Sequence, residues 1–284
     1  MRVVITGADG RLGLALQAAL PHEHGFQRLA ATEIKAVDLP EWDITDPHTV
    51  ERLAGLEPDL VVHCAAMTDV DGCARNPDLA FRVNAFGTQN VALACQRRDA
   101  AMVCVSTNEV FDGTASRPYI EFDATHPANA YGASKLAGET MAARLLHSLY
   151  VVRISWLFAP GANNFVSKIV ARADQQGRLS VVTDEVANPT YAPDLATAIW
   201  HLAGTGHYGI YHLVNEGYCS RYEFAVEILK QSGRERVPVQ PITSDKFQRA
   251  SKPPAFAPLA NTVGAALGVR LRPWQDALRD YFRE

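Results

Sequence analysis

Tyr131 and Lys135 are the residues of this chain whose types and spacing best suit acid–base chemistry. They are four positions apart, so on a helix both side chains lie on one face. A free tyrosine titrates near pH 10 (about 10 in model peptides), and a nearby ammonium group lowers the pKa of the phenol by stabilising the phenolate. The hydroxyl of Thr107, which follows a predicted strand, can polarise a carbonyl at the same point. Together the three residues predict a site that reduces a ketone beside a nicotinamide.

Three glycines near the N-terminus, Gly7, Gly10 and Gly13, predict where that nicotinamide cofactor binds. They follow the β-branched run Val3–Ile5 and open an Ala- and Leu-rich helix that ends at Pro21. Gly7 allows a tight turn, Gly10 lets the backbone approach a pyrophosphate, and Gly13 lets the helix pack closely on the strand. The amides of the first helical turn then face the phosphates. The spacing is GxxGxxG rather than GxGxxG, and a purely structural turn is the alternative.

A framework of strands and helices must hold these residues together. Buried strands are predicted at 3–5, 59–66, 101–105 and 150–154, and long helices at 76–98 and 130–146. Alternating strands and helices are typical of a Rossmann-type, doubly wound, parallel α/β sheet. We place a dinucleotide-binding domain at residues 1–155. Residues 156–284 are predicted to form mainly a small α/β substrate lobe that is interleaved with the main sheet.

The second strand of this framework lies somewhere between residues 28 and 38 and has two alignments. One alignment ends the strand at Glu33, and the other ends it at Asp38. An acidic residue at the carboxyl end of this strand accepts hydrogen bonds from the adenosine ribose. We favour Asp38 and keep Glu33 as the alternative. A short strand is then predicted to begin at Asp43, followed by a helix over 48–56. Asn84, on the helix after the next strand, is interpreted as a structural hydrogen-bonding group.

Composition excludes several classes of function. The chain has 284 residues, of which 48% are hydrophobic and 20% charged, as in ordinary globular proteins. A formal net charge of −4 gives no reason to expect nucleic-acid or membrane partners. Its apolar runs are too short to span a membrane, and the first strand leaves no room for a cleaved signal. The five cysteines are scattered without a CxxC pair and are interpreted as reduced thiols of a cytoplasmic protein.

Motifs along almost the whole chain resemble the extended short-chain dehydrogenase/reductases, and within them the dTDP-4-dehydrorhamnose reductases. Among these motifs are VSTNEVFDG, YGASKLAGE, RISWLF, NPTYAPDLA and GIYHLVN. The resemblance implies a catalytic set of Thr107, Tyr131 and Lys135. The implied reaction is the NADPH- or NADH-dependent reduction of the C4 ketone of dTDP-4-dehydro-6-deoxy-L-hexose to dTDP-L-rhamnose.

The resemblance also implies contacts with both ligands. Cofactor contacts are expected at Gly7, Gly10, Arg11, Leu12, Gly13, Asp38, Asp43, Ile44, Ala65, Ala66, Met67, Tyr131 and Lys135. Contacts with the nucleotide-sugar substrate are expected at Thr107, Asn108 and Trp156. We assign no residue to a metal site.

The chain departs from the usual family pattern at three places. Asn108-Glu109 replaces the usual Asp-Tyr after Thr107, Arg11 replaces a frequent Gln, and Lys252 replaces an Arg before a proline. Because its charge would repel a pyrophosphate, we expect Glu109 to lie outside the substrate contacts.

Two other functions remain as alternatives. One is a non-catalytic regulatory subunit that keeps the fold and the cofactor and binds a partner enzyme. The other is a reductase or epimerase of another nucleotide sugar. The intact set of Thr107, Tyr131 and Lys135 favours catalysis. The sequence leaves open the exact sugar, the preference between NADH and NADPH, any use of Mg²⁺, and assembly as a homodimer.

Overall fold

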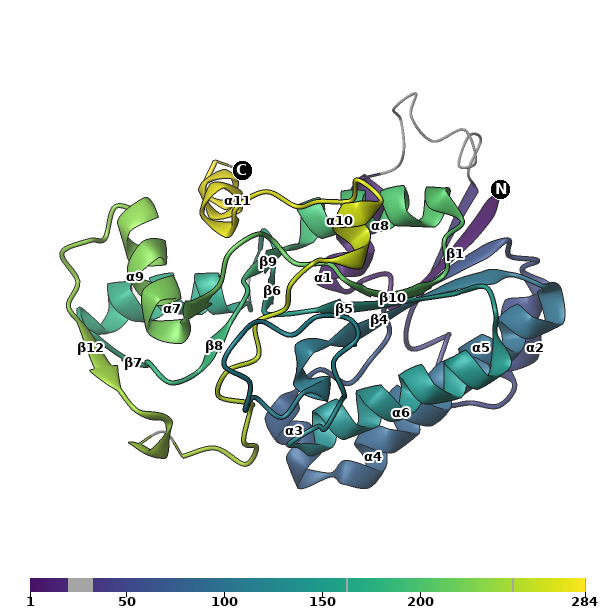
Figure 1. The fold of residues 1–284 in the computed structure, drawn as a ribbon, viewed down its shortest axis with the longest axis horizontal. Coiled ribbons are helices and arrows are strands. Elements are labelled where there is room, and N and C mark those ends of the chain that lie inside the picture. The colour runs from purple at the N-terminus through teal and green to yellow at the C-terminus, as the bar shows by residue number, and fades with distance from the viewer. Residues whose placement is uncertain (20–32, 162, 247, 284) are drawn as a thin grey trace.

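A six-stranded parallel sheet is the framework of the protein in the computed structural model, which describes residues 1–19, 33–161, 163–246 and 248–283 (Figure 1). The predicted end of the first helix at Pro21 and residues 28–32 of the second-strand region lie outside the described residues. The strands follow the order β10-β5-β4-β3-β1-β2. Their bounds are β1 Arg2–Thr6, β2 Glu33–Val37, β3 Leu60–His63, β4 Ala101–Thr107, β5 Leu149–Ile154 and β10 Gly209–His212.

The strand order reverses at β1, and this creates the crevice where doubly wound sheets bind ligands. From β1 the chain passes through α1 (Arg11–Ala18) to β2 on one side, and β3 pairs with the other side of β1. Side chains of β1 from Val3 to Ile5 are fully buried, as a strand covered on both faces requires. The glycine turn at the carboxyl end of β1 therefore opens at this crevice.

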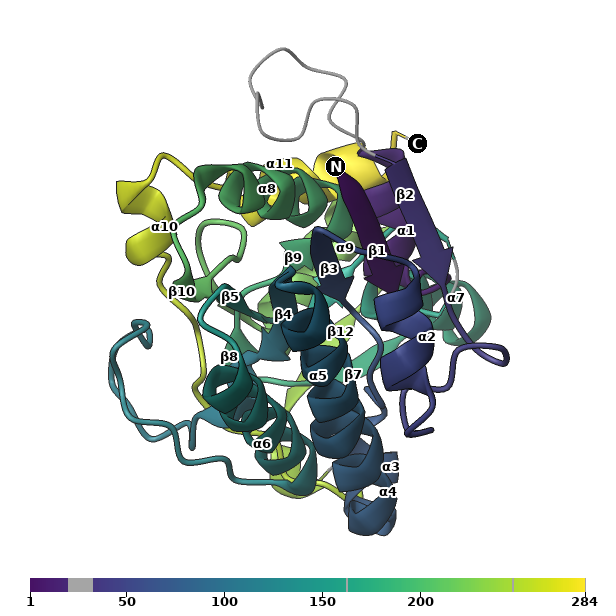
Figure 2. The same ribbon diagram turned by 90° about the vertical axis from the view of Figure 1, so that its right-hand side faces the viewer.

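Helices cover both faces of the sheet (Figures 1 and 2). One face carries α1 and α8 (Ala192–Thr205), and the buried Trp200 of α8 donates a hydrogen bond to the Leu16 carbonyl, with 3.1 Å between the atoms. The other face carries α2 (Thr49–Gly55), α5 (Thr88–Arg98) and α6 (Ala130–Leu145). Because β10 and α8 come from the second half of the chain, the main sheet is completed by residues beyond 156.

The long helix predicted over 76–98 is helical throughout but is not one regular α-helix. Asn76 caps α4 (Pro77–Phe81), which continues as a π-helical turn, η1 (Arg82–Gly87), and then as α5. Asn84 lies within the π-helical turn and is 1% exposed. A further short helix, α3 (Val70–Arg75), precedes it and was not predicted. π-Helical turns are frequent at functional sites, so the segment 82–87 is a candidate part of the site.

A second hydrophobic cluster lies beyond the main sheet. It is built from α7 (Phe165–Gln176), α9 (Arg221–Gln231), α11 (Trp274–Tyr281) and the parallel pair β7 (Leu179–Val182) and β12 (Val239–Ile242). The remaining short elements are η2 Asn108–Val110, β6 Leu157–Phe158, β8 Val186–Ala187, β9 Thr190–Tyr191, β11 Cys219–Ser220, η3 Ser244–Lys246 and α10 Val263–Ala266. The domain boundary near residue 155 stays a prediction.

The short strand predicted to begin at Asp43 is wrong. Residues 43–48 form turns, and the following helix begins at Thr49. The Asp43 carboxylate accepts a hydrogen bond from the Thr45 amide at 2.8 Å, and Asp46 accepts one from the His48 amide at 2.9 Å. Aspartates that bind nearby amides favour turns over strand pairing, which explains the difference.

Two further observations concern the whole chain. Within the described ranges, no helix is long and apolar enough to cross a membrane. All five cysteines are free thiols, and those buried are Cys73, Cys95, Cys104 and Cys219.

Candidate active site

The glycine turn contains two glycines that the fold needs and one that it does not. Gly7 has φ +68°, and a Cβ there would lie 2.6 Å from the Ala65 amide nitrogen. A Cβ on Gly13 would collide with the Gly7 carbonyl oxygen and lie 2.6 Å from the Ala8 Cα. At Gly10, apart from its chain neighbours, the only atom of the described residues within 4 Å of an added Cβ is the Gly7 carbonyl oxygen, at 3.1 Å. The backbone at Gly10, which precedes the first turn of α1, is therefore open toward the crevice.

A cleft of about 820 Å³ lies outside the carboxyl ends of β1 and β3. Every predicted cofactor residue except Met67 lines it, and so do Asp9, Leu39, Trp42 and Ser106. Met67 lies beside the cleft, where its amide donates to the Asn84 side chain at 2.8 Å and its carbonyl accepts from the same amide group at 3.1 Å. Asn84 also donates to Ser134 of α6 at 3.0 Å. The predicted structural role of Asn84 thus links the loop after β3 to the helix of Tyr131.

Asp38, and not Glu33, stands at the cleft. It follows the carboxyl end of β2, and its two carboxylate oxygens accept hydrogen bonds from the amides of Asp9 (2.8 Å) and Leu39 (2.7 Å). Glu33 begins the strand at the opposite end and forms ion pairs with Lys35 and Arg2. The favoured alignment of the second strand therefore agrees with the structure.

The structure brings Thr107, Tyr131 and Lys135 together at the cleft. Tyr131 and Lys135 lie in the first two turns of α6, and both line the cleft. Thr107 ends β4, and its hydroxyl lies close enough to Tyr131 to lower the pKa of the phenol. The Asn129 side chain accepts a hydrogen bond from the Gly132 amide at 2.9 Å and so caps the helix. A proton donor at the cleft thus has the hydroxyl of the neighbouring strand end beside it.

The pKa of Tyr131 is raised, mainly by burial and then by the negative charge of Glu109, while the hydrogen bond from Thr107 opposes the shift. This direction is opposite to the lowering that we expected from Lys135. Lys135 is 5% exposed, and its charge, after burial, helps to lower the pKa of His63 to about 3. His63 is therefore neutral, and its ring is hydrogen-bonded to Thr6 at 2.7 Å and Thr88 at 3.0 Å.

Gly132 sets the distance between Thr107 and Tyr131. A Cβ on Gly132 would collide with the carbonyl oxygen of Glu109, which follows Thr107 by two residues. The turn after β4 can therefore pack directly on the first turn of α6. The sequence analysis missed this role, although the glycine directly after the tyrosine in YGASK is the signal that would have indicated it.

A buried ion pair fixes α6 against the two neighbouring strands. The Glu139 carboxylate, one turn after Lys135, pairs with Arg153 of β5 at 3.1 Å (Nε) and 2.8 Å (Nη2), and accepts a hydrogen bond from Ser106. The side chains of Glu139 and Arg153 are 6% and 4% exposed. Because Ser106 precedes Thr107 and is in register with Arg153, this contact positions the helix relative to the strand end.

Removing the carboxylate would leave the Arg153 guanidinium buried without its counter-charge. We expect Glu139→Gln to lower the free energy of unfolding by about 3–5 kcal/mol, as when one partner of a buried pair is lost. Denaturant unfolding measures this. Glu51→Gln is the matched control, because its ion pair with Arg97 is more than half exposed and should contribute less than about 1 kcal/mol. Equal losses in the two variants would contradict the account.

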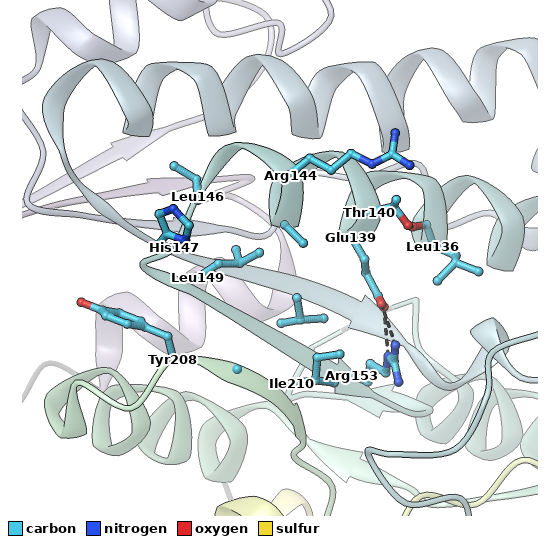
Figure 3. Close-up of a pocket in the computed structure, with 13 residues that line it drawn as sticks. Leu136, Glu139, Thr140, Arg144, Leu146, His147, Leu149, Arg153, Tyr208 and Ile210 are labelled. Atoms are coloured by element: carbon cyan, nitrogen blue, oxygen red, sulfur yellow. Dashed lines mark hydrogen bonds and ion pairs between the residues drawn. The ribbon is translucent and has the colours of Figure 1, made fainter.

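A second cavity, of about 540 Å³, lies between α6 and the strands β5 and β10 (Figure 3). Its walls include Leu146, Leu149, Tyr208 and Ile210, and the bonded Glu139 and Arg153 lie at the end away from Tyr208. None of the predicted catalytic, cofactor or substrate residues lines it. The site that holds the predicted chemistry is therefore the cleft at the strand ends.

A third cavity, of about 490 Å³, adjoins the cleft and shares Arg11, Thr68 and Leu157 with it. Trp156 lines its wall with φ +37°, a conformation that is unfavourable for a bulky residue and is often retained for function. The Arg221 guanidinium carbon lies 3.6 Å from the centroid of the Trp156 ring. The charged lining residues are Arg11, Lys168, Arg172, Arg221, Arg249, Asp71 and Glu185. An excess of basic groups suits a diphosphate.

Asn108 and Arg11 hold parts of this region together. Asn108 is buried, and its side-chain amide donates to the Ala257 carbonyl at 3.0 Å. Its contact with the substrate stays a prediction. The Arg11 guanidinium donates to the Asn163 carbonyl across the junction of the two cavities. Among the described residues, no group of three or more His, Cys, Asp or Glu side chains is arranged to hold a metal ion.

Glu109, which we expected to lie outside the substrate contacts, lines neither of the two cavities but is partly covered near Tyr131. It is half-buried, it raises the pKa of Tyr131, and it accepts a hydrogen bond from Asn129 at 2.6 Å. Asn129 also donates to the carbonyl of Lys252, at 3.3 Å. Two of the three departures from the family pattern therefore meet at one asparagine.

A parallel sheet with a glycine turn at its switch point and a Thr–Tyr–Lys set at the neighbouring strand ends defines an extended short-chain dehydrogenase/reductase. The family model described as the RmlD substrate binding domain matches residues 1–284. A dTDP-4-dehydrorhamnose reductase of Mycobacterium tuberculosis is 39% identical, over 98% of this chain and 91% of the relative. The spore coat polysaccharide biosynthesis protein SpsK of Bacillus subtilis is 36% identical, over 100% and 97%.

Solved structures agree with these sequence relatives. The dTDP-4-dehydrorhamnose reductase of Bacillus anthracis, solved in complex with NADP, superposes with a TM-score of 0.93 at 36% identity, over 99% of this chain and 98% of that one. The chain belongs to the dTDP-4-dehydrorhamnose reductase family.

Proposed function

We propose that this protein reduces the C4 ketone of dTDP-4-dehydro-6-deoxy-L-hexose with NADPH or NADH and yields dTDP-L-rhamnose. One observation carries the proposal: Tyr131 and Lys135 line a glycine-turn cleft that adjoins a second, basic cavity. The names of the M. tuberculosis and B. anthracis relatives support the same reaction. An intact proton donor at this junction favours an enzyme over a regulatory subunit.

The cleft suits a nicotinamide dinucleotide. The open backbone at Gly10 and the first turn of α1 would hold the pyrophosphate, since no side chain in the described part of the chain comes within 4 Å of a Cβ on Gly10. Asp38 would accept hydrogen bonds from the adenosine ribose, and Lys135 would bind the nicotinamide ribose. When bound, the reduced nicotinamide supplies the hydride that adds to C4 of the sugar.

Tyr131 donates its phenolic proton to the sugar O4, and Thr107 orients the phenol and polarises the carbonyl. Because burial and Glu109 raise the pKa of Tyr131, the phenol is protonated at neutral pH, as a proton donor must be. In the adjoining cavity, the basic side chains would bind the diphosphate, and Trp156 would form an apolar wall for the methyl group of the 6-deoxy sugar.

We expect NADH and NADPH to bind with affinities that differ by less than about a hundredfold. Asp38 favours NADH because its carboxylate would repel a 2′-phosphate, whereas Arg11 attracts phosphate charge. Fluorescence titration of the purified protein with each cofactor gives the two Kd values. A preference above a hundredfold, or about 2.7 kcal/mol, would show that these opposing charges are misjudged.

A panel of nucleotide sugars tests the proposed substrate. We expect the isolated protein to oxidise NADPH with the dTDP-linked 4-keto-6-deoxy-hexose and to be much slower with the UDP- and GDP-linked 4-keto sugars. Preference for another nucleotide, or interconversion of sugars without net cofactor oxidation, would favour the reductase or epimerase alternatives.

A further inference from the structure

Glu109 is a charged residue beside Tyr131 for which the proposed chemistry has given no role. It lies in η2, directly after β4, and its carbonyl oxygen packs on Gly132 beside Tyr131. Its side chain is half-buried, and its charge acts on the phenol of Tyr131. The carboxylate is therefore beside the group that must reach the reacting carbonyl.

One of the two oxygens of the Glu109 carboxylate accepts a hydrogen bond from a side chain. Asn129 donates its side-chain amide to Glu109 Oε2 at 2.6 Å, while its own carbonyl oxygen caps α6 through the Gly132 amide. The orientation of the carboxylate is thus tied to the helix that carries Tyr131. Within the described ranges, no hydrogen bond to Oε1 is observed. A carboxylate can accept about four hydrogen bonds, so most of its capacity is unused.

The neighbouring arginines do not use that capacity. Arg221 pairs with Glu185 at 3.7 Å, and Arg249 pairs with Asp71 at 3.2 Å and with Glu185 at 3.6 Å. The charges of Arg249 and Arg221 still lower the pKa of Glu109, whereas burial, the largest effect, raises it and Glu185 adds to the increase. A desolvated acceptor with a single donor is unfavourable until a further donor reaches it.

The chemistry of the sugar identifies that donor. Tyr131 must contact O4, so a group beside Tyr131 faces the substituents of the ring carbons next to C4. In a 6-deoxy-hexose, C5 carries the methyl group, and C3 carries a hydroxyl. Building on the proposed function, we propose that Glu109 is a specificity-determining residue that accepts a hydrogen bond from the C3 hydroxyl of the keto-sugar. Where the family usually has an aromatic side chain, this chain then requires a hydroxyl donor.

The test compares two substrates in three proteins. The substrates are the dTDP-linked 4-keto-6-deoxy-hexose and its 3-deoxy analogue, and the proteins are wild type, Glu109→Ala and Glu109→Gln. In wild type, loss of the 3-hydroxyl should lower kcat/KM by about 10- to 100-fold, the scale of a hydrogen bond to a charged group. In Glu109→Ala the two substrates should differ by less than about threefold. Glu109→Gln keeps an acceptor oxygen and should give an intermediate ratio.

Asp112→Asn is the matched control. Asp112 is on the same segment, but its carboxylate accepts hydrogen bonds from Thr114 and Tyr119 and, unlike that of Glu109, does not act on the Tyr131 phenol. This variant should keep the wild-type discrimination. An equal penalty for the 3-deoxy sugar in wild type and in Glu109→Ala would overturn the assignment while leaving the proposed reduction intact. If wild type reduced neither sugar, the proposed function itself would be wrong, and the assignment with it.

Discussion

Tyr131→Phe is expected to lower kcat by about a hundredfold or more, with little change in the Kd of the cofactor. The substitution removes only the phenolic hydroxyl at the cleft, and a positioned general acid typically contributes at least this factor. Phenylalanine keeps the aromatic ring of Tyr131, so the cleft should keep its shape. Steady-state turnover and cofactor titration together separate the two effects.

Tyr208→Phe provides the control for this experiment. Tyr208 is 46% exposed and lines the second cavity, away from the strand ends. Its variant should retain wild-type turnover. If Tyr131→Phe also turned over at a near-wild-type rate, Tyr131 would be a packing residue on the helix and the proton donor would lie elsewhere.

Gly10→Val should abolish binding of both NADH and NADPH, with a loss of affinity above about a hundredfold. Among the described residues, an added Cβ meets the Gly7 carbonyl oxygen alone, at 3.1 Å, so the valine side chain would extend into the cleft that Gly10 lines. That space is the one we assign to the pyrophosphate. Because the protein itself has room for the side chain, the fold should persist.

Gly13→Val should instead affect the stability of the fold. There the added side chain meets the backbone of Gly7 and Ala8, so the expected loss is in the thermal stability of the protein. Cofactor titration and thermal unfolding of both variants distinguish the two roles. Unchanged cofactor affinity in a folded Gly10→Val protein would remove the glycine turn from the site.

Local patterns predicted the parts of this site that depend on neighbouring residues. The run Val3–Ile5 followed by spaced glycines predicted a buried strand, a turn and a helix, and the structure has all three. The four-residue spacing of Tyr131 and Lys135 predicted one helix face at the cleft. These signals are short-range, so one sequence is enough to interpret them.

Contacts between distant residues could not be predicted in this way. Glu139 can contact Ser106 and Arg153 together because the register of β4 and β5 places those two residues side by side. Glu109 reaches Asn129 where Gly132 lets a turn pack on α6. Charge alone suggested that Glu109 would lie outside the substrate contacts. The arginines that act on its carboxylate, Arg221 and Arg249, come more than a hundred residues later in the chain, so the local sequence could not show them. The strand predicted at Asp43 was wrong for a simpler reason: the Asp43 carboxylate binds a nearby amide, and this local hydrogen bond competes with strand pairing.

The most direct test of the central claim is a reaction of the purified chain alone with NADPH and dTDP-4-dehydro-6-deoxy-L-hexose, followed by nuclear magnetic resonance of the product. We predict one equivalent of NADPH oxidised for each dTDP-L-rhamnose formed, and retention in the product of deuterium at C4 when the reduced cofactor carries deuterium on its transferable position. Cofactor binding without oxidation or product, by a folded protein with an intact Tyr131, would contradict the account and identify a cofactor-binding subunit.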